Sequence, residues 1–337
     1  MTRLFRVPAL LALLVFACLL ALPRPGFAEE DNILNMYVAY GGPEEIAVAF
    51  KEATGITVNF LTMSSGEVLT RLRAEKQNPG SDVWFGGGSD AFIQAATEEL
   101  IAPYVSPNAA GVAPEFKDEQ GYWTGVSLVV VGFTVNTERL QNKGLPEPAT
   151  WADLENPAFK DEILASNPNT SGTAYTTVSG VLQIKGEEEG WKALGNIYNN
   201  IPFLTKSGSA PGEKALAGEF AVGISPDPHN LVMFNPDAPL KAVLPSDGVL
   251  AWPSPVAMIA NCKHPENARK FIDWTLTPEG QLILMKASPR VPTTNVEPLP
   301  GVPSLTGLNL VPYDLRKWGA ARESVVEQFN QTFPQFR

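Results

Sequence analysis

The clearest pattern of apolar and polar positions runs from Ile56 to Phe92. An apolar run predicts a strand that ends at Ser64, and the spacing of apolar residues after it predicts a helix. The sequence SDVWFGG predicts a second strand, and another helix begins near Ser89 and Asp90. This order is a βαβ unit, so we expect an α/β fold with a parallel sheet and crossover helices.

The same alternation of strand-like and helix-like segments continues through the rest of the chain. Two apolar runs, Leu128–Asn136 and Val256–Ala260, are candidates for strands that cross between two halves of the molecule. The other predicted strands are Ile33–Val38, Glu162–Ser166 and Phe220–Ser225, and the predicted helices lie near Glu44–Thr54, Ala91–Glu99, Trp151–Asn156, Thr170–Ile184, Glu188–Asn199 and Glu213–Gly218.

The first candidate binding site is the strand-to-helix turn at Ser64, Ser65 and Gly66. Ligands of parallel sheets bind at such turns because the first amides of a helix have no internal partner and carry the positive end of its dipole. Ser64 and Glu67 also have the spacing of a capping box. Capping alone and an anion site that uses the remaining amides both stay open, because Gly66 lets a ligand approach the backbone.

The second candidate site is the turn formed by Ser171, Gly172, Thr173 and Ala174. No Glu or Gln follows three residues after the serine, so a capping box is excluded and the amides are more available than those after Ser64. The hydroxyls of this turn can donate to phosphate or carboxylate oxygens. A simple N-cap and an anion site are both compatible with the pattern.

A third candidate is the segment Pro226-Asp227-Pro228-His229-Asn230, which follows the strand Phe220–Ser225. Two prolines that flank an aspartate predict a rigid loop at the carboxyl end of this strand. Asp227 and His229 are therefore candidates for hydrogen bonds to a solute. The alternatives are that His229 is structural and that Asp227 only braces the loop.

The amino terminus has the pattern of a secretory signal peptide, residues 1–28. Basic MTRLFR precedes an apolar run, and cleavage is expected after Ala28, which places the mature protein in the periplasm. The run is short for a membrane span, and prolines follow it, which argues against a retained anchor. Lipid attachment at Cys18 is the lesser alternative, because Phe16 stands where a small residue is typical.

Charge and cysteine content exclude several classes. Without the three arginines of the leader, 22 basic residues face 36 acidic ones, a net charge of −14. Such a chain is neither a nucleic-acid binder nor a polybasic membrane protein. Cys262 is the only cysteine outside the leader, so an internal disulfide and a Cys-rich metal site are excluded. We expect no cofactor and no resident metal.

Four stretches together resemble the substrate-binding proteins of ABC importers: LNMYVAYGGPEEIAVAFKEATGITV, TMSSGEVLTRLRAEKQNPGSDVWFGGGSDAFIQAATEELIAPY, GYWTGVSLVVVGFTVNTERL and HPENARKFIDWTLTPEGQLIL. They are most similar to the group that holds ferric-ion, hexose-phosphate, phosphonate and thiamine binders, over nearly the whole mature chain. The resemblance implies a type II fold whose two lobes close around one solute. It also implies a monomer that meets an inner-membrane ABC permease. The expected lobes are residues 29–127 with 255–300, and 128–254 with 301–337.

The chain departs from the ferric binders of this group. They typically carry a Tyr-Tyr pair after the strand that corresponds to Phe220–Ser225, and many hold a histidine where this chain has Tyr40 and Gly41. An arginine often follows the Trp-x-Gly-x-Ser element, but here Leu128 follows Ser127. Ferric iron needs several anionic oxygens. The expected solute is therefore a phosphorylated or phosphonate-type anion, with ferric ion or thiamine as the alternative.

Enzymatic activity is not expected from the motifs. The chain has no G-x-S-x-G, H-E-x-x-H or Walker-type loop, and no lysine follows Gly86-Gly87-Gly88. The set of expected ligand-binding residues also includes Gly88, which stands at a predicted helix start, and Tyr40, Gly41 and Ser127. A hydrolytic enzyme and a structural surface protein remain as alternatives from other classes. The first predicts turnover of a phosphorylated solute, and the second predicts no small-molecule thermal shift.

Overall fold

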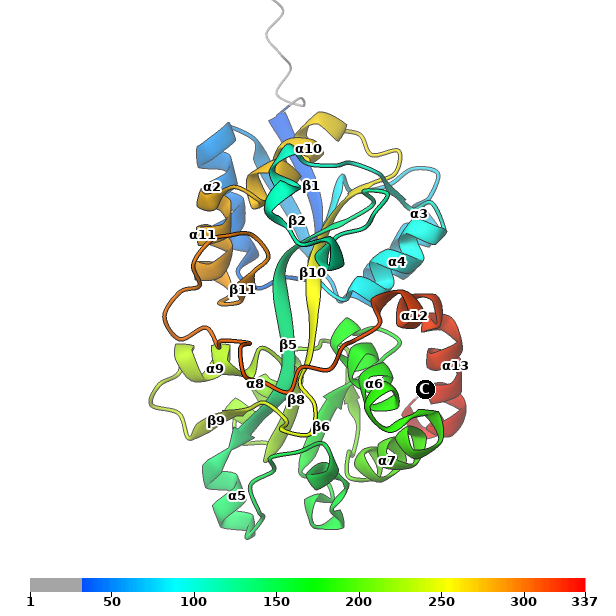
Figure 1. The fold of residues 1–337 in the computed structure, drawn as a ribbon, viewed down its shortest axis with the longest axis vertical. Coiled ribbons are helices and arrows are strands. Elements are labelled where there is room, and N and C mark those ends of the chain that lie inside the picture. The colour runs from blue at the N-terminus through cyan, green and yellow to red at the C-terminus, as the bar shows by residue number, and fades with distance from the viewer. Residues whose placement is uncertain (1–31, 337) are drawn as a thin grey trace, which may run out of the picture.

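The computed structural model describes residues 32–336, which form two lobes of mixed helices and strands, one above the other in Figure 1. The expected signal peptide (1–28), its cleavage after Ala28 and the alternative lipid anchor at Cys18 lie outside the described residues. Among the helices that the structure describes, none is long and apolar enough to cross a membrane. The α/β class and the two-lobed arrangement are confirmed.

The upper lobe in Figure 1 is built on the strands β1 (Ile33–Val38), β2 (Thr57–Thr62) and β3 (Val83–Phe85). β1 pairs in parallel with both others, which confirms the βαβ unit. Alternate residues face opposite sides of the sheet, so Met36 and Tyr37 are buried in different clusters. The other elements here are α2 (Pro43–Thr54), α3 (Ser65–Glu75), α4 (Ser89–Thr97), β4 (Ile101–Ala102), α10 (Pro265–Thr275), α11 (Pro278–Ala287) and the 3-10 turns Pro107–Gly111 and Pro114–Phe116.

The lower lobe packs around one hydrophobic cluster that includes the fully buried rings of Phe133 and Trp151. The Trp151 indole donates a hydrogen bond of 2.9 Å to the carbonyl of Gly248, so this ring also ties a loop to the core. The helix expected at Trp151–Asn156 is a shorter 3-10 turn, because Pro157 disfavours a helical conformation at the preceding residue. The elements here are α5 (Thr137–Lys143), β6 (Ile163–Ser166), α6 (Gly172–Lys185), α7 (Glu187–Asn199), β7 (Leu204–Thr205), α8 (Ala210–Leu216), β8 (Val222–Pro226), α9 (Pro228–Phe234), β9 (Leu240–Val243) and the 3-10 turns Ala152–Glu155 and Pro157–Phe159.

Two long antiparallel strands, β5 (Thr124–Asn136) and β10 (Leu250–Ile259), pass between the lobes. β10 begins earlier than expected and includes Pro253. Proline lacks an amide hydrogen, and this half of β10 pairs with β5 on one side only, an edge position at which proline is tolerated. The strand order β2-β1-β3-β10-β5-β8-β6-β7 continues through both lobes, and the expected lobe boundaries stay a prediction.

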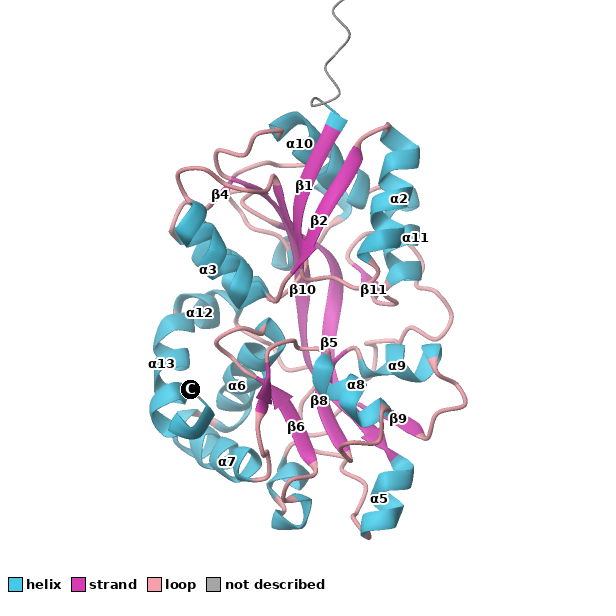
Figure 2. Cartoon of the chain, turned by 180° about the vertical axis from the view of Figure 1, so that it is seen from behind, coloured by secondary structure: helices cyan, strands magenta, loops and turns pink. Residues whose placement is uncertain are grey.

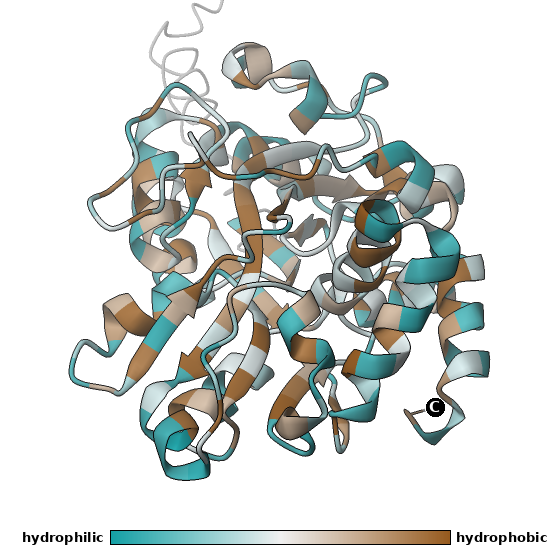
Figure 3. Ribbon diagram, turned by 60° about the horizontal axis from the view of Figure 1, so that its bottom comes forward, coloured by the Kyte–Doolittle hydropathy of each residue, from teal (hydrophilic) through white to brown (hydrophobic). Residues whose placement is uncertain are grey.

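The carboxyl-terminal segment contacts both lobes. It contains β11 (Val291–Pro292), α12 (Leu315–Ala320), α13 (Arg322–Thr332) and a final 3-10 turn, Pro334–Phe336. α12 packs against α4 of the upper lobe, whereas Phe333, directly after α13, stacks on Tyr198 in the lower lobe. Figure 2 shows α12 and α13 at one side of the junction between the lobes and β11 at the other. In Figure 3, hydrophobic residues concentrate in the central strands and hydrophilic ones on the outer helices.

A buried ion pair joins the carboxyl-terminal segment to the upper lobe. The Arg322 guanidinium lies 3.2 Å from the Asp90 carboxylate, and both side chains are almost fully buried. Burial raises the pKa of Asp90, and the charge of Arg322 opposes that rise. The charge of Arg322 therefore favours the ionised form of Asp90 in a region where burial alone would disfavour it.

Arg322→Met should reduce the free energy of unfolding by about 3–5 kcal/mol at neutral pH, because Asp90 loses its cation. The folded-state pKa of Asp90 then lies further above its unfolded value, so the folded state binds the proton more tightly and the deficit shrinks as the pH falls. The double variant Asp90→Asn/Arg322→Met should regain most of the loss. Urea unfolding measures all three proteins, and an unchanged stability of Arg322→Met would contradict this account.

Candidate ligand-binding site

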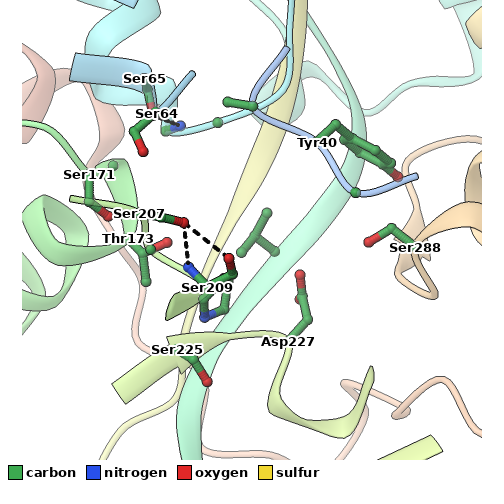
Figure 4. Close-up of a pocket in the computed structure, with 18 of the residues that line it drawn as sticks. Tyr40, Ser64, Ser65, Ser171, Thr173, Ser207, Ser209, Ser225, Asp227 and Ser288 are labelled. Carbon is green, nitrogen blue, oxygen red and sulfur yellow. Dashed lines mark hydrogen bonds between the residues drawn. The ribbon is translucent and has the colours of Figure 1, made fainter. Parts of the chain in front are cut away.

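A cavity of about 530 Å³ lies between the lobes, with walls from helix starts and loops of both (Figure 4). The segments that line it include residues 39–42, 62–65, 87–88, 171–173, 206–209 and 225–227. The expected site residues in its wall are Tyr40, Gly41, Ser64, Ser65, Gly88, Ser171, Gly172, Thr173 and Asp227, whereas Gly66, Ser127, Ala174 and His229 do not line it.

The start of α3 is capped as expected and contacts the facing lobe. The Glu67 carboxylate accepts a hydrogen bond of 3.2 Å from the Ser64 amide, which is part of the capping box. The Ser64 hydroxyl donates to the carbonyl of Lys206 at 3.3 Å. The Gly66 amide donates to the carbonyl of Thr170 at 2.7 Å. Two polar groups of this turn are thus bonded to the other lobe rather than presented to the cavity.

Glycines allow this close contact between the lobes. A methyl group on Gly66 would lie 2.3 Å from the carbonyl oxygen of Asn169, and one on Gly172 would lie 2.7 Å from the amide nitrogen of Gly88. Both distances are shorter than any tolerated contact, so only glycine permits the approach. The Gly88 amide also donates to the Ser65 hydroxyl at 3.0 Å. Residues near three helix starts therefore meet backbone to backbone at one side of the cavity.

The start of α6 keeps donors available to a ligand. The Ser171 hydroxyl accepts hydrogen bonds from the Ala174 amide at 3.2 Å and from the Ser166 hydroxyl at 3.0 Å, so it is the N-cap. Gly172 and Thr173 are the first two helical residues, whose amides have no intrahelical acceptor. Among the described residues, no hydrogen bond occupies these two amides or the Thr173 hydroxyl.

Sequence reasoning missed the loop of residues 206–209, which faces the α6 start across the cavity. The hydroxyls of Ser207 and Ser209 lie 3.0 Å apart, and Ser209 donates to the Glu213 carboxylate at 2.8 Å. The Lys206 ammonium has no ion pair with any described residue. The polar run Lys206-Ser207-Gly208-Ser209 before a helix could have indicated this loop. The preceding strand β7 has only two residues and was not recognised in the sequence.

The other end of the cavity contains a buried ion pair. The Asp227 carboxylate accepts hydrogen bonds from the Arg290 side chain at 2.6 Å and from the Val130 amide at 3.0 Å. Both charged side chains are at least nine-tenths buried. Burial, the largest single influence, lowers the pKa of Arg290, but Asp227 and Tyr40 together outweigh it, so the net shift is upward and the guanidinium stays charged. Asp227 thus braces β5 and Arg290, while its role toward a solute stays a prediction.

The expected loop around Asp227 was wrong, because α9 begins at Pro228. Asp227 takes a left-handed conformation (φ 47°), and the proline that follows suits the first position of a helix, where no amide hydrogen is needed. The ring of His229 lies outside the cavity wall, with Nε2 at 3.0 Å from the carbonyl oxygen of Pro289. The helix therefore turns His229 toward a neighbouring loop.

Tyr40 forms an aromatic wall near the same ion pair. The Arg290 guanidinium stacks on its ring at 4.4 Å, and the Tyr40 hydroxyl lies 3.2 Å from the hydroxyl of Ser127. Ser127 itself lies outside the cavity wall. Burial raises the pKa of Tyr40, so its hydroxyl stays protonated. Tyr40 is the only tyrosine in the described wall.

The charges that line the cavity are nearly balanced. Lys206 and Arg290 are cationic, whereas Glu67, Asp227 and Glu213 are anionic. Each anion has a hydrogen-bond donor, and Arg290 is paired, so Lys206 is the cation of the described wall without a counter-charge. Among the residues that the structure describes, no group of three His, Cys, Asp or Glu side chains is arranged to hold a metal.

This chain is similar to known proteins in both sequence and structure. An uncharacterised protein of Haemophilus influenzae (strain ATCC 51907 / DSM 11121 / KW20 / Rd) is 32% identical over 298 residues, 86% of each chain. A putative 2-aminoethylphosphonate-binding periplasmic protein of Salmonella paratyphi A is 26% identical, over 69% of this chain and 68% of that protein.

The solved structure of the periplasmic binding protein AfuA from Actinobacillus pleuropneumoniae, with exogenous fructose-6-phosphate bound, has 31% identity and a TM-score of 0.85. The match covers 89% of this chain and 98% of that one. The family model of bacterial extracellular solute-binding proteins matches residues 81–315. The resemblance seen in the sequence is confirmed, and the chain belongs to the family of bacterial extracellular solute-binding proteins.

Proposed function

We propose that the protein captures a small solute with a phosphoryl or phosphonyl group in the interlobe cavity and delivers it to an inner-membrane ABC permease. The observation that carries this proposal is the start of α6. There the free amides of Gly172 and Thr173 and the Thr173 hydroxyl line the cavity. Amides at a helix start favour an oxyanion, because they donate hydrogen bonds from the positive end of the helix dipole.

The loop of residues 206–209 completes an oxyanion cradle opposite α6. Its hydroxyls lie near Thr173 in Figure 4, and the Lys206 ammonium adds a positive charge that no described carboxylate neutralises. Hydrogen bonds from charged or dipolar donors to an oxyanion are stronger than neutral ones. One cation and several neutral donors suit a single phosphoryl group, since the wall as a whole has little net charge.

The comparisons support this class of solute. Fructose-6-phosphate, bound in the AfuA structure, and 2-aminoethylphosphonate, the solute of the putative binding protein from Salmonella paratyphi A, both have a tetrahedral phosphorus oxyanion. Both of these proteins are described as periplasmic, which agrees with the signal peptide expected at residues 1–28. A binding protein located in the periplasm binds its solute there and requires no catalytic group.

Closure of the lobes is part of the proposal. The backbone contacts of Gly66 with Thr170 and of Gly172 with Gly88 join segments on opposite sides of the cavity. These contacts form only when the lobes are together, so solute binding and lobe contact stabilise the same state. We therefore expect an open state in which both are lost.

Thr173→Val should weaken binding of fructose 6-phosphate by about 1.5–3 kcal/mol, the range for a hydrogen bond to a charged group. Thr177→Val is the matched control. Its hydroxyl bonds to the carbonyl of Thr173 one turn further along the helix and does not line the cavity. Calorimetric titration gives both affinities. Equal affinities in the two variants would leave the α6 start without a role in binding.

Gly66→Ala should lower the affinity about tenfold or more, because the added methyl group keeps the lobes from reaching the closed state. The stability of the folded lobe should not decrease, since alanine is a better helix former than glycine. Gly195→Ala is the control, because a methyl group there would meet nothing within 4 Å. Small-angle scattering with saturating solute should show Gly66→Ala as the more expanded protein, and a fully compact variant with native affinity would argue against the proposed closure.

Ferric iron should not bind as the physiological ligand. Only Tyr40 among the tyrosines lines the described cavity, and burial raises its pKa, which disfavours the phenolate that iron requires. The purified protein with ferric citrate should therefore lack a visible phenolate-to-iron charge-transfer band. A strong band at stoichiometric iron would show that tyrosines assemble a site after lobe movement.

A further inference from the structure

The carboxyl-terminal helices α12 and α13 meet the upper lobe along a contact that we call the seam. It contains the close packing of Gly319 in α12 on Ile93 in α4. It also contains three ion pairs: Arg322 with Asp90 of α4, Glu323 with Arg73 of α3, and Arg316 with Glu119 of the loop before β5. Of these pairs, the first is buried and the other two are exposed. Figure 1 shows α12 between α4 and the lower lobe.

The same two helices are attached to the lower lobe through its hydrophobic core. Trp318 of α12 and Phe329 of α13 are buried in the cluster of that lobe. The hydroxyl of Tyr175 in α6 donates a hydrogen bond to the Trp318 carbonyl. Pulling these helices out of the core would expose large apolar side chains to water. α12 and α13 should therefore stay with the lower lobe when the lobes separate.

Arg322 lies between the first turns of α4 and α6. Its guanidinium is 3.2 Å from the Asp90 carboxylate and 5.0 Å from the centre of the Tyr175 ring. None of these three side chains lines the cavity. A methyl group on Gly88 would lie 2.3 Å from Oδ1 of Asp90 and 2.9 Å from Cα of Gly172. The ion pair is therefore next to the backbone contact of the two glycines, outside the cavity wall.

The ion pairs do not commit the lobes to one state. By distance and angle, the Asp90 carboxylate oxygens and Nη1 of Arg322 have no hydrogen-bond partner among the described residues. A buried ion pair without hydrogen bonds gains little over the cost of removing both charges from water, and both charges regain water when the lobes part. Each exposed pair contributes little, and salt screens it. The seam is therefore easier to separate than the shared core of the lower lobe.

We propose that the lobes part along the seam, so that Asp90 leaves Arg322 when the cavity opens and returns to it when the cavity closes. Arg322 stays with Tyr175 of α6, whereas Asp90 moves with α4. When Gly88 leaves Gly172, the residues that follow in these two helices must separate as well. Arg322 and Asp90 are thus positioning residues for the closed state, which act through the two helix starts. This inference rests on the closure in the proposed function and adds where the lobes separate.

A reversible cross-link across the seam tests this proposal. A Cβ atom on Gly319 would lie 2.9 Å from Cβ of Ile93, and a shift to about 3.5–4.5 Å suits a disulfide. Ile93→Cys/Gly319→Cys is combined with Cys262→Ser in the mature protein, so that only the new thiols can oxidise. Small-angle scattering without solute should show the reduced variant expanded like the unmodified protein. The oxidised variant should keep the compact dimensions of the closed structure.

Equal scattering by the oxidised and reduced variants would overturn the inference. If both are expanded, the lobes part elsewhere, and if both are compact, they do not part at all. No solute is present in this experiment, so its result is independent of the solute class in the proposed function.

A charge swap tests the seam without new cysteines. Arg316→Glu puts a like charge beside Glu119 and should weaken binding of fructose 6-phosphate about two- to fivefold, the range for one exposed pair. Adding Glu119→Arg should restore the affinity, which it would not do if Arg316→Glu only damaged the fold. Lys192→Glu is the control and should leave the affinity unchanged, because Lys192 pairs only within α7.

The charge swap also separates the two proposals. Failure of Glu119→Arg to restore the affinity, or an equal effect of Arg316→Glu and Lys192→Glu, would contradict the role of the seam. If fructose 6-phosphate does not bind the unmodified protein, the proposed function fails, and the scattering experiment still decides whether the lobes part along the seam.

Discussion

Backbone contact between the lobes is the constraint on which the rest of the structure depends. Gly66 donates to the Thr170 carbonyl, and Gly172 lies against Gly88 so closely that no side chain fits at either position. This contact brings the start of α6 beside the starts of α3 and α4 and closes one side of the cavity. The long strands β5 and β10 hold the lobes together at its back. Under the proposed closure, solute binding and the contact between the lobes would be coupled through the same few glycines.

The two ends of the cavity differ in the charges and hydrogen-bonding groups that line them. At the α6 start, free amides, hydroxyls and Lys206 provide a field for an oxyanion without a full set of counter-charges. At the other end, the Arg290 and Asp227 pair supplies rigid donors and acceptors but no net charge. Under the proposed function, the oxyanion of the solute binds at the α6 start.

The sequence predicted what depends on local pattern. The βαβ unit, the crossing strand β5, the capping box at Ser64 and the N-cap at Ser171 all follow from residues close to one another in the chain. It failed where a contact joins distant segments, as between Asp227 and Arg290. It also failed where proline was interpreted only as a breaker, since Pro253 lies within β10 and Pro228 begins α9. The loop of residues 206–209 was missed because the strand before it, β7, has only two residues, too few to show an alternation of apolar and polar positions.

The most direct test of the central claim is native mass spectrometry of the mature protein with an equimolar mixture of matched solutes. The mixture contains fructose 6-phosphate with fructose, and 2-aminoethylphosphonate with ethanolamine. The account predicts one-to-one complexes of phosphorus-containing members only, because only they present an oxyanion to the α6 start. Complexes with fructose or ethanolamine at equal intensity, or no complex with either phosphorus compound, would contradict it.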